Sequence, residues 1–269
     1  MRIFDSHAHY DDRAFDGDRE EVLDSLVPAG ILAVMNAGSD RSSSEAALRL
    51  TEQRDFLYGA AGIHPASAEE WAGPEPAAGE AWLTELLSHP KMRAIGEIGL
   101  DYHWPEPSRE LQKQCFAGQL ETARRLGVPV IIHSREAAQD TLAIMKEAGG
   151  SELSAVIHCF SYTVETARIC LDLGYYIGIG GVLTYANSRK LREVAAYVPA
   201  DRILLETDCP YLTPVPNRGH RNDSRNLTYV LAALASLRGI STEEAARITW
   251  ENALRFYRIA DSRQEGPHS

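Results

Sequence analysis

Histidine and acidic residues end several apolar runs of this sequence, beginning with "RIFDSHAHYDD" near the N-terminus. His7 and His9 stand one residue apart there, so on an extended strand their side chains share one face. Later apolar runs end in the same residue types, at His64 in "GIHP", Glu97 in "AIGEIG", His133 in "VIIH", His158 in "AVIH" and Asp208 in "LLETD". Imidazole and carboxylate groups are ligands of divalent metals, so the pattern indicates metal-assisted hydrolysis wherever these groups converge.

The apolar runs alternate with amphipathic segments along the whole chain. Eight runs predict strands, at residues 2–7, 31–38, 56–64, 92–99, 128–133, 154–160, 174–181 and 202–208. Helical periodicity is clear in three of the intervening segments, 19–30, 108–127 and 241–257. The last of these begins with Ser241 and Glu244, in the spacing of a capping box.

Eight strand–helix repeats predict a protein of the α/β class that folds as a (β/α)8 TIM barrel. Parallel strands require crossover connections, and a chain of about 250 residues is typical of this barrel. We expect a single domain over residues 1–260 and a frayed C-terminal tail over 261–269. A doubly wound open sheet is the alternative, but no G-x-G-x-x-G motif follows the first run.

In a closed barrel of parallel strands, the carboxyl ends of all the strands lie at the same end of the barrel. The first and eighth strands are then neighbours, as are the fifth and sixth. This arrangement assigns His7, His9 and Asp208 to one divalent ion, His133 and His158 to a second, and Glu97 to both as a bridge. Two ions about 3.5–4 Å apart would clamp a phosphoryl or acyl centre and generate hydroxide near neutral pH.

Each of these residues also has a structural interpretation when taken alone. A single histidine after a strand is usually a hydrogen-bonding residue, and Asp208 fits a turn. The metal interpretation rests on the placement of all six groups at one end of the fold. Elsewhere, we expect His89 to be structural and His103 to lie in a surface loop. Cys159 and Cys209 follow two of the proposed ligands, and alternation along a strand predicts that both point into the core.

Composition limits the classes of function. The formal net charge of −11 argues against a protein that coats nucleic acid by charge alone, although bound cations change the local sign. The four cysteines form no C-x-x-C pair, which favours reduced thiols in a cytoplasmic protein. No apolar run is long enough to span a bilayer, and the N-terminus lacks the pattern of a signal peptide.

Six stretches occur together in an order typical of one family. They are "FDSHAHYDD", "GIHP", "GEIGLDYH", "PVIIHSREA", "IHCFS" and "LLETDCPYLTPVPNRGHRN". The chain closely resembles the TatD family of metal-dependent deoxyribonucleases, within the wider group of amidohydrolase-like barrels. The resemblance extends from Phe4 to the helical segment ending near Tyr257.

The resemblance implies a binuclear site that hydrolyses phosphodiester bonds of DNA through water activated by two divalent cations (Mg, Mn, Zn or Co), as an exonuclease. The family's ligand positions match the six residues assigned above. Its "GIHP" histidine matches His64, placed near the scissile phosphate, where it would stabilise the phosphate or protonate the leaving oxygen. Asp208 would bind metal and also accept the water proton. Some members read Arg-Asn-Glu-Pro where this chain has Asp223 and Ser224 after Arg-Asn, which bears on substrate preference.

Several residues on the predicted active face suit a nucleic-acid substrate. Cationic or polar side chains for flanking phosphates are Arg135, Arg218, His220 and Arg221, and aromatic side chains for stacking on bases are Tyr102, Trp104 and Tyr211. Ordinary surface charge and loop packing are the alternative interpretations. The expected partner is single-stranded DNA or a frayed end, with no membrane and no obligate protein partner.

Two other functions remain open at this stage. A metal-dependent amidohydrolase or esterase would use the same ligands, but many such barrels bridge their metals with a carbamylated lysine on strand four. Glu97 occupies that position here, and the nearest lysine, Lys91, lies at the other end of the strand. A catalytically inactive scaffold is the second alternative, and the complete set of ligand residues does not favour it.

Overall fold

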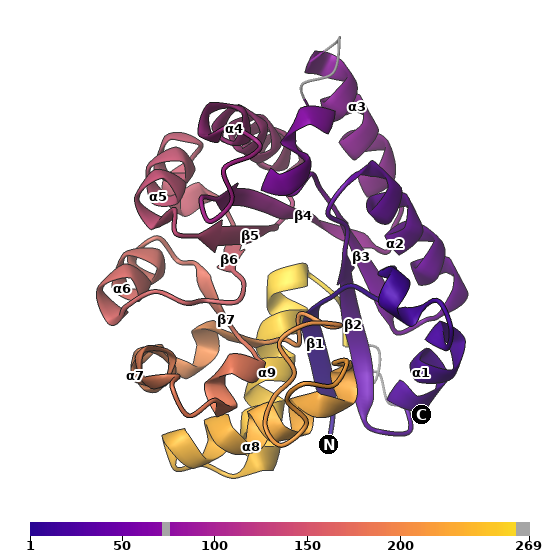
Figure 1. The fold of residues 1–269 in the computed structure, drawn as a ribbon, viewed down its shortest axis with the longest axis vertical. Helices are drawn as coiled ribbons and strands as arrows, with labels where there is room; N and C mark the ends of the chain where they lie inside the picture. The colour runs from indigo at the N-terminus through magenta and orange to yellow at the C-terminus, as the bar shows by residue number, and fades with distance from the viewer. Residues whose placement is uncertain (72–75, 262–269) are drawn as a thin grey trace, which may run out of the picture.

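Eight parallel strands follow one another round a single sheet in chain order, and helices cover its outer face (Figure 1). The computed structural model describes residues 1–71 and 76–261. The strands are β1 (Ile3–Ala8), β2 (Ile31–Ala37), β3 (Leu57–Ala61), β4 (Met92–Asp101), β5 (Val130–Arg135), β6 (Ala155–Ile157), β7 (Tyr176–Ile179) and β8 (Ile203–Leu205). This order confirms the predicted (β/α)8 barrel and excludes the doubly wound sheet.

The helices alternate with the strands as the periodicity predicts. They are α1 (Arg19–Leu26), α2 (Arg41–Gln53), α3 (Pro76–Leu87), α4 (Arg109–Leu126), α5 (Ala138–Glu147), α6 (Val164–Asp172), α7 (Arg189–Tyr197), α8 (Leu227–Arg238) and α9 (Thr242–Tyr257). Helix α4 shows how the sequence sets the ends. Ser108 Oγ accepts the N–H of Leu111, and Gly127 ends the helix in the left-handed region at φ 66°.

Helix α9 seals the barrel at the amino-terminal ends of the strands. The ring of Phe4, near the start of β1, lies 6.0 Å from that of Trp250 and 5.7 Å from that of Tyr257. Ser241 caps the helix by accepting the N–H of Glu244, as the sequence predicts. With that end filled by aromatic side chains, the carboxyl ends of the strands are left to form a site.

The barrel closes where β1 meets the segment after β8. The N–H of Asp208 donates to the carbonyl of His7 at 2.9 Å, and the N–H of His9 donates to that of Cys209 at 2.8 Å. Beneath this seam, the buried carboxylate of Asp5 accepts the hydroxyls of Thr207 and Ser224, each at 2.6 Å. Closure therefore brings His7, His9 and Asp208 together through the backbone.

The carboxyl ends of five strands come earlier than predicted, and three of these strands precede proposed site residues. His64, His158 and Asp208 were expected within strands ending at 64, 160 and 208, but β3, β6 and β8 end at Ala61, Ile157 and Leu205. At Asp208 and at Cys159, directly after His158, the backbone has a φ of 58° and 46°, in the left-handed region rather than the extended region of a strand. The chain turns at these points, and the turns aim the side chains into the barrel mouth.

The remaining predictions about the chain concern its cysteines, membrane spans and tail. All four cysteines are free thiols, as predicted. Within residues 1–71 and 76–261, no helix is long and apolar enough to cross a membrane. Most of the predicted tail, residues 262–269, lies outside the described residues, so the boundary at 260 stays a prediction.

Candidate metal centre

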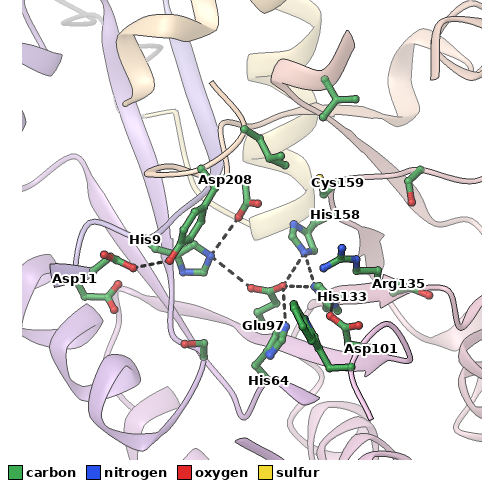
Figure 2. A pocket seen from close by; sticks show the side chains of 18 residues that line it. His9, Asp11, His64, Glu97, Asp101, His133, Arg135, His158, Cys159 and Asp208 are labelled. Carbon is green, nitrogen blue, oxygen red and sulfur yellow. Dashed lines mark hydrogen bonds and ion pairs between the residues drawn. The ribbon is translucent and has the colours of Figure 1, made fainter. Parts of the chain in front are cut away.

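Four histidines and two carboxylates meet at the carboxyl ends of the strands. His7 lies on β1 and His9 directly after it, Glu97 lies within β4, His133 on β5, His158 directly after β6 and Asp208 after β8. All six come from the positions that the sequence identified. Figure 2 shows Glu97 at the middle of the group, between His9 and Asp208 on one side and His133 and His158 on the other.

The two oxygens of Glu97 face two different sets of histidines. Oε2 lies 3.4 Å from His7 Nε2 and 3.5 Å from His9 Nε2. Oε1 lies 2.7 Å from both His133 Nδ1 and His158 Nε2. A carboxylate that divides its oxygens in this way has the arrangement of a bridging ligand.

The first half of the centre consists of His7, His9 and Asp208. His7 Nε2 lies 3.0 Å from His9 Nε2, and Asp208 Oδ1 lies 3.6 Å and 3.4 Å from these two nitrogens. Ligands held about 2.0–2.2 Å from one cation are separated from one another by roughly 3.0–3.5 Å. The observed separations therefore fit a shared ion. His9 Nδ1 donates to the carbonyl of Ala37 at 2.8 Å, which leaves the lone pair of Nε2 free for that ion.

The second half of the centre consists of His133 and His158. His158 Nε2 lies 3.4 Å from His133 Nδ1, and both nitrogens face Glu97 Oε1. His133 also contacts Asp101, whose Oδ2 lies 3.2 Å from His133 Nε2. Asp101 is not among the predicted site residues, although Glu97 and Asp101 are four residues apart and the two-residue period of a strand places both on one face.

The electrostatics of the centre suit a cation. Burial opposes charge on Glu97, but the charge of His158 and hydrogen bonds from His133 and His158 hold its pKa well below the usual value. Burial lowers the pKa of His7 to about 4, so its ring is neutral at physiological pH. Burial also opposes charge on His133, yet Asp101 and Glu97 raise its pKa to about 9. Ionised carboxylates beside imidazoles thus attract positive charge, and a donor set of this kind fits divalent metals.

His64 lies at the edge of the centre, where it caps the short 3-10 segment Pro65–Glu70. Its Nδ1 accepts the N–H of Ala66 at 3.1 Å, so the neutral ring carries its proton on Nε2. Burial lowers the pKa of His64 to about 3, which keeps the ring neutral. Nε2 lies 3.7 Å from Glu97 Oε1. His64 therefore presents an N–H donor to the centre.

The centre lies in the floor and wall of a cavity of about 850 Å³, a size that suits a small ligand. Its lining includes the carboxylates of Asp11, Asp12, Glu97, Asp101 and Asp208 but, apart from the histidines, one cationic side chain, Arg135. The exposed rings of Trp104 and Tyr211 also line it, and the Tyr211 hydroxyl donates to Asp12 at 2.8 Å. An anionic ligand would be repelled by such a lining unless cations were bound.

Cys159 also lines this cavity, so the prediction that it points into the core is wrong. The positive φ of Cys159 interrupts the strand alternation on which that prediction was based. Its backbone N–H donates a short hydrogen bond to the buried carboxylate of Glu206. Gly178 leaves room for this carboxylate, since a Cβ there would lie 2.5 Å from Glu206 Oε2. Cys209 is fully buried, as predicted.

Three of the predicted substrate-binding residues lie away from the cavity, in the long segment after β8. Arg218 stacks on the ring of Tyr185, with 4.2 Å between the guanidinium carbon and the ring centroid. Arg221 forms an ion pair with Asp18 at 2.6 Å. His220 and Arg221 line a second cavity of about 340 Å³.

Three other residues of the sequence analysis also lie outside the cavity lining. Tyr102 donates its hydroxyl to Asp140 at 2.7 Å. His103 lies in an exposed loop, as expected, and contacts Glu136. His89 lies between α3 and β4. These placements leave Arg135, Trp104 and Tyr211 as the predicted substrate contacts that the structure brings to the cavity.

Comparison with known proteins matches the sequence of this chain to one family. The family model of TatD-related DNases matches residues 4–258. The chain belongs to the TatD family. It is 40% identical over 257 residues to the metal-dependent hydrolase YabD of Bacillus subtilis, covering 96% of this chain and 99% of the relative. It is 35% identical over 263 residues to the 3′-5′ ssDNA/RNA exonuclease TatD of Erwinia tasmaniensis, covering 96% and 100%.

Solved structures show the same relationship. The crystal structure of the TatD homologue YJJV of Escherichia coli superposes with a TM-score of 0.88 at 31% identity, covering 96% of this chain and 99% of that one. The chain is therefore a metal-dependent hydrolase of the TatD family.

The departure from the TatD pattern at Asp223 and Ser224 lies outside the cavity lining. Ser224 Oγ donates to Asp5, and the N–H of Ser224 donates to the Tyr10 hydroxyl at 2.9 Å. Asp223 caps the short segment Ser224–Asn226 and pairs with Arg225 at 2.8 Å. In this chain Ser224 supports the seam under the centre, and a proline in its place would lack both of its donors.

Proposed function

We propose that the chain is a deoxyribonuclease that hydrolyses phosphodiester bonds of single-stranded DNA or frayed ends as an exonuclease, with two divalent cations. The observation that carries this proposal is the division of Glu97, whose Oε2 faces His7 and His9 while Oε1 faces His133 and His158. Some TatD relatives are named 3′-5′ ssDNA/RNA exonuclease, which supports the substrate class and favours attack from the 3′ end. The four free thiols fit the cytoplasmic location expected from the sequence.

Six side chains would bind the cations: His7, His9 and Asp208 the first, His133 and His158 the second, and Glu97 both. Bound there, Mg, Mn, Zn or Co would supply the positive charge that the acidic lining lacks and would acidify water near neutral pH. Asp208 is held ionised despite its burial, because the histidines around it lower its pKa. Its carboxylate can therefore accept a proton from the attacking water.

His64 and the mouth of the cavity would act on the substrate itself. The Nε2–H of His64 would donate to an oxygen of the scissile phosphate, which is the first of the two roles expected for this residue. Arg135 would contact a neighbouring phosphate, and Trp104 and Tyr211 would stack on bases. Arg218, His220 and Arg221 lie outside this cavity, so a role for them requires a longer strand that reaches the second cavity.

The alternative of an amidohydrolase with a carbamylated lysine has less support. Lys91 Nζ donates to the carbonyls of Thr51 and Arg54 at 2.9 and 2.8 Å, away from the centre. Among the described residues that line the cavity there is no lysine. Glu97 occupies the bridging position instead.

The proposal is tested with the purified chain and end-labelled single-stranded DNA, assayed in parallel with a panel of esters, lactones and amides. Each substrate is incubated with Mg, Mn, Zn or Co and with a chelator. We expect stepwise release of nucleotides from one end, which the chelator abolishes and added metal restores. Turnover of a small ester or amide with no cleavage of DNA would contradict the proposal.

A further inference from the structure

Asp101 is a buried carboxylate of the cavity with no role in the proposed reaction so far. It ends β4 and is 6% exposed. Its Oδ2 lies 3.2 Å from His133 Nε2, while the other nitrogen of that ring, Nδ1, lies 2.7 Å from Glu97 Oε1. The imidazole of His133 is thus held between two carboxylates, as Figure 2 shows.

Asp101 is itself fixed by neighbouring groups. Its Oδ1 accepts the N–H of His103 at 2.9 Å, so Oδ2 remains directed at His133. The backbone N–H of Asp101 donates to Gln112 Oε1 at 2.9 Å, and Gln112 Nε2 donates to the carbonyl of Pro107 at 2.8 Å. These two hydrogen bonds tie the backbone at the end of β4 to helix α4 and the segment before it.

His64, Asp101 and His133 bring ligand atoms within 4.8 Å of one another, so the cluster has the composition of a third metal site. The number of lone pairs on the two histidine rings argues against a third metal ion. A neutral imidazole has one lone pair, and His133 Nδ1 already faces Glu97 beside His158 Nε2. The Nδ1 lone pair of His64 accepts the N–H of Ala66. With a cation bound at His133 Nδ1, both rings carry their proton on Nε2, and neither has a second lone pair for another ion.

We propose that Asp101 is a positioning residue that accepts the Nε2–H of His133 and so directs the Nδ1 lone pair to the second cation. This inference rests on the binuclear centre proposed above. A carboxylate behind a histidine ligand fixes the ring's tautomer and orientation and increases its basicity. In the first half of the centre, the carbonyl of Ala37 has the corresponding place behind His9. The second ion therefore depends on a side chain where the first depends on the backbone.

The first test is calorimetric titration of the metal-free full-length chain with Zn²⁺ alone. Asp101→Asn keeps an acceptor for His103 but removes the charge, and Asp101→Ala removes both. Asp140→Asn is the matched control, because Asp140 pairs with Lys113 and Tyr102 outside the cavity. We expect two zinc ions per wild-type chain and about 10- to 100-fold weaker binding of the second ion in both Asp101 variants.

A positioning role is distinguished from a general structural one by the first ion. Its affinity, and the thermal midpoint of the metal-free chain, should match those of the wild type in Asp101→Asn. Equal loss of both ions in this variant, or wild-type affinity for both, would overturn the proposal. A wild-type chain that binds fewer than two zinc ions would overturn the binuclear centre and this inference with it.

The second test needs no substitution. Long-range ¹H–¹⁵N NMR spectra of the zinc-loaded chain with labelled histidine report which ring nitrogen carries the proton. We expect His133 to be protonated at Nε2, with its signal assigned by its loss in His133→Gln. A proton on Nδ1 would mean that Nε2 binds the ion, and would overturn the proposal even with two ions bound.

Discussion

The two halves of the proposed metal centre are built in different ways. His7 and His9 come from the end of one strand and meet Asp208 across the seam that closes the barrel. His133 and His158 come from the ends of separate strands, and the ring of His133 lies between the carboxylates of Glu97 and Asp101. The first half is therefore fixed by the path of the backbone, whereas the second depends on the side chain of Asp101.

This difference predicts that the two ions are held with unequal affinity and exchange at unequal rates. A site whose ligands are held by backbone hydrogen bonds loses little when one neighbouring side chain changes. A site in which a ligand is oriented by another side chain exchanges its ion more readily. We expect the ion at His7, His9 and Asp208 to remain bound and the ion at His133 and His158 to exchange with ions in solution.

The largest effect is expected from the residue that the two halves share. Glu97→Gln removes the charge that both ions would contact, and we expect loss of both ions and a fall in kcat of about ten-thousand-fold. Metal content and single-stranded DNA hydrolysis are measured on the same preparation. Glu121→Gln, on the surface of α4 beside Arg124, is the control. Near-wild-type activity in Glu97→Gln would mean that no ions are bridged there.

A matched pair of ligand variants separates the two halves. His133→Ala should lose the second ion, keep the first, and lower kcat by about 100- to 1,000-fold with little change in stability. His9→Ala should lose the first ion and also lose the hydrogen bond that joins His9 to the end of β2 at Ala37. Atomic absorption and thermal unfolding give both readouts. If the two variants lose the same number of ions with equal loss of stability, the halves are equivalent.

His64 lies beside the second half, and its tautomer predicts an intermediate effect. Gln carries an N–H where His64 carries Nε2–H, so His64→Gln should keep most activity, while His64→Ala should lose about 100-fold. The loss in His64→Ala should be the same for DNA and for a diester with a nitrophenolate leaving group. Restoration of activity with the nitrophenyl diester would show instead that His64 protonates the leaving oxygen.

The smallest effect concerns stability under the centre. Burial raises the pKa of Glu206 from its usual value of 4.5 to about 8. Between these pH values the folded chain keeps a proton that the unfolded chain releases, so this stabilisation is complete below about pH 4.5 and is lost as pH rises to about 8. The free energy of unfolding should fall by up to about 1.4 kcal/mol per pH unit from this group.

Urea unfolding of the metal-free chain at several pH values between 5 and 8 measures this slope. Glu206→Gln stays neutral and still offers an oxygen to the N–H of Cys159, so its stability should fall less steeply with pH than that of the wild type. Parallel curves for the two proteins would contradict the shift.

The sequence predicted the barrel and the convergence of the six proposed ligands because both depend on local patterns. Strand alternation and the shared direction of parallel strands place His7, His133 and Glu97 without knowledge of distant contacts. The predictions failed where the backbone leaves those patterns. The positive φ at Cys159 turned its side chain into the cavity, and β8 ended at Leu205.

Features that depend on long-range contacts were also missed. Asp101 lies on the same face as Glu97, but its contact with His133 arises only from the register of β4 against β5. Ser224 looked like a departure in a substrate loop, yet it joins Asp5 across more than two hundred residues of chain. Arg221 looked free for phosphate, but Asp18 pairs with it.

The most direct test of a shared pair of ions is the electron paramagnetic resonance spectrum of the manganese-loaded chain. We expect two Mn²⁺ ions per chain and, if Glu97 bridges them, a multiline spectrum from magnetic exchange between the two ions. Glu97→Gln should abolish the multiline spectrum. A single ion per chain, or two ions with the spectrum of isolated Mn²⁺, would contradict the account.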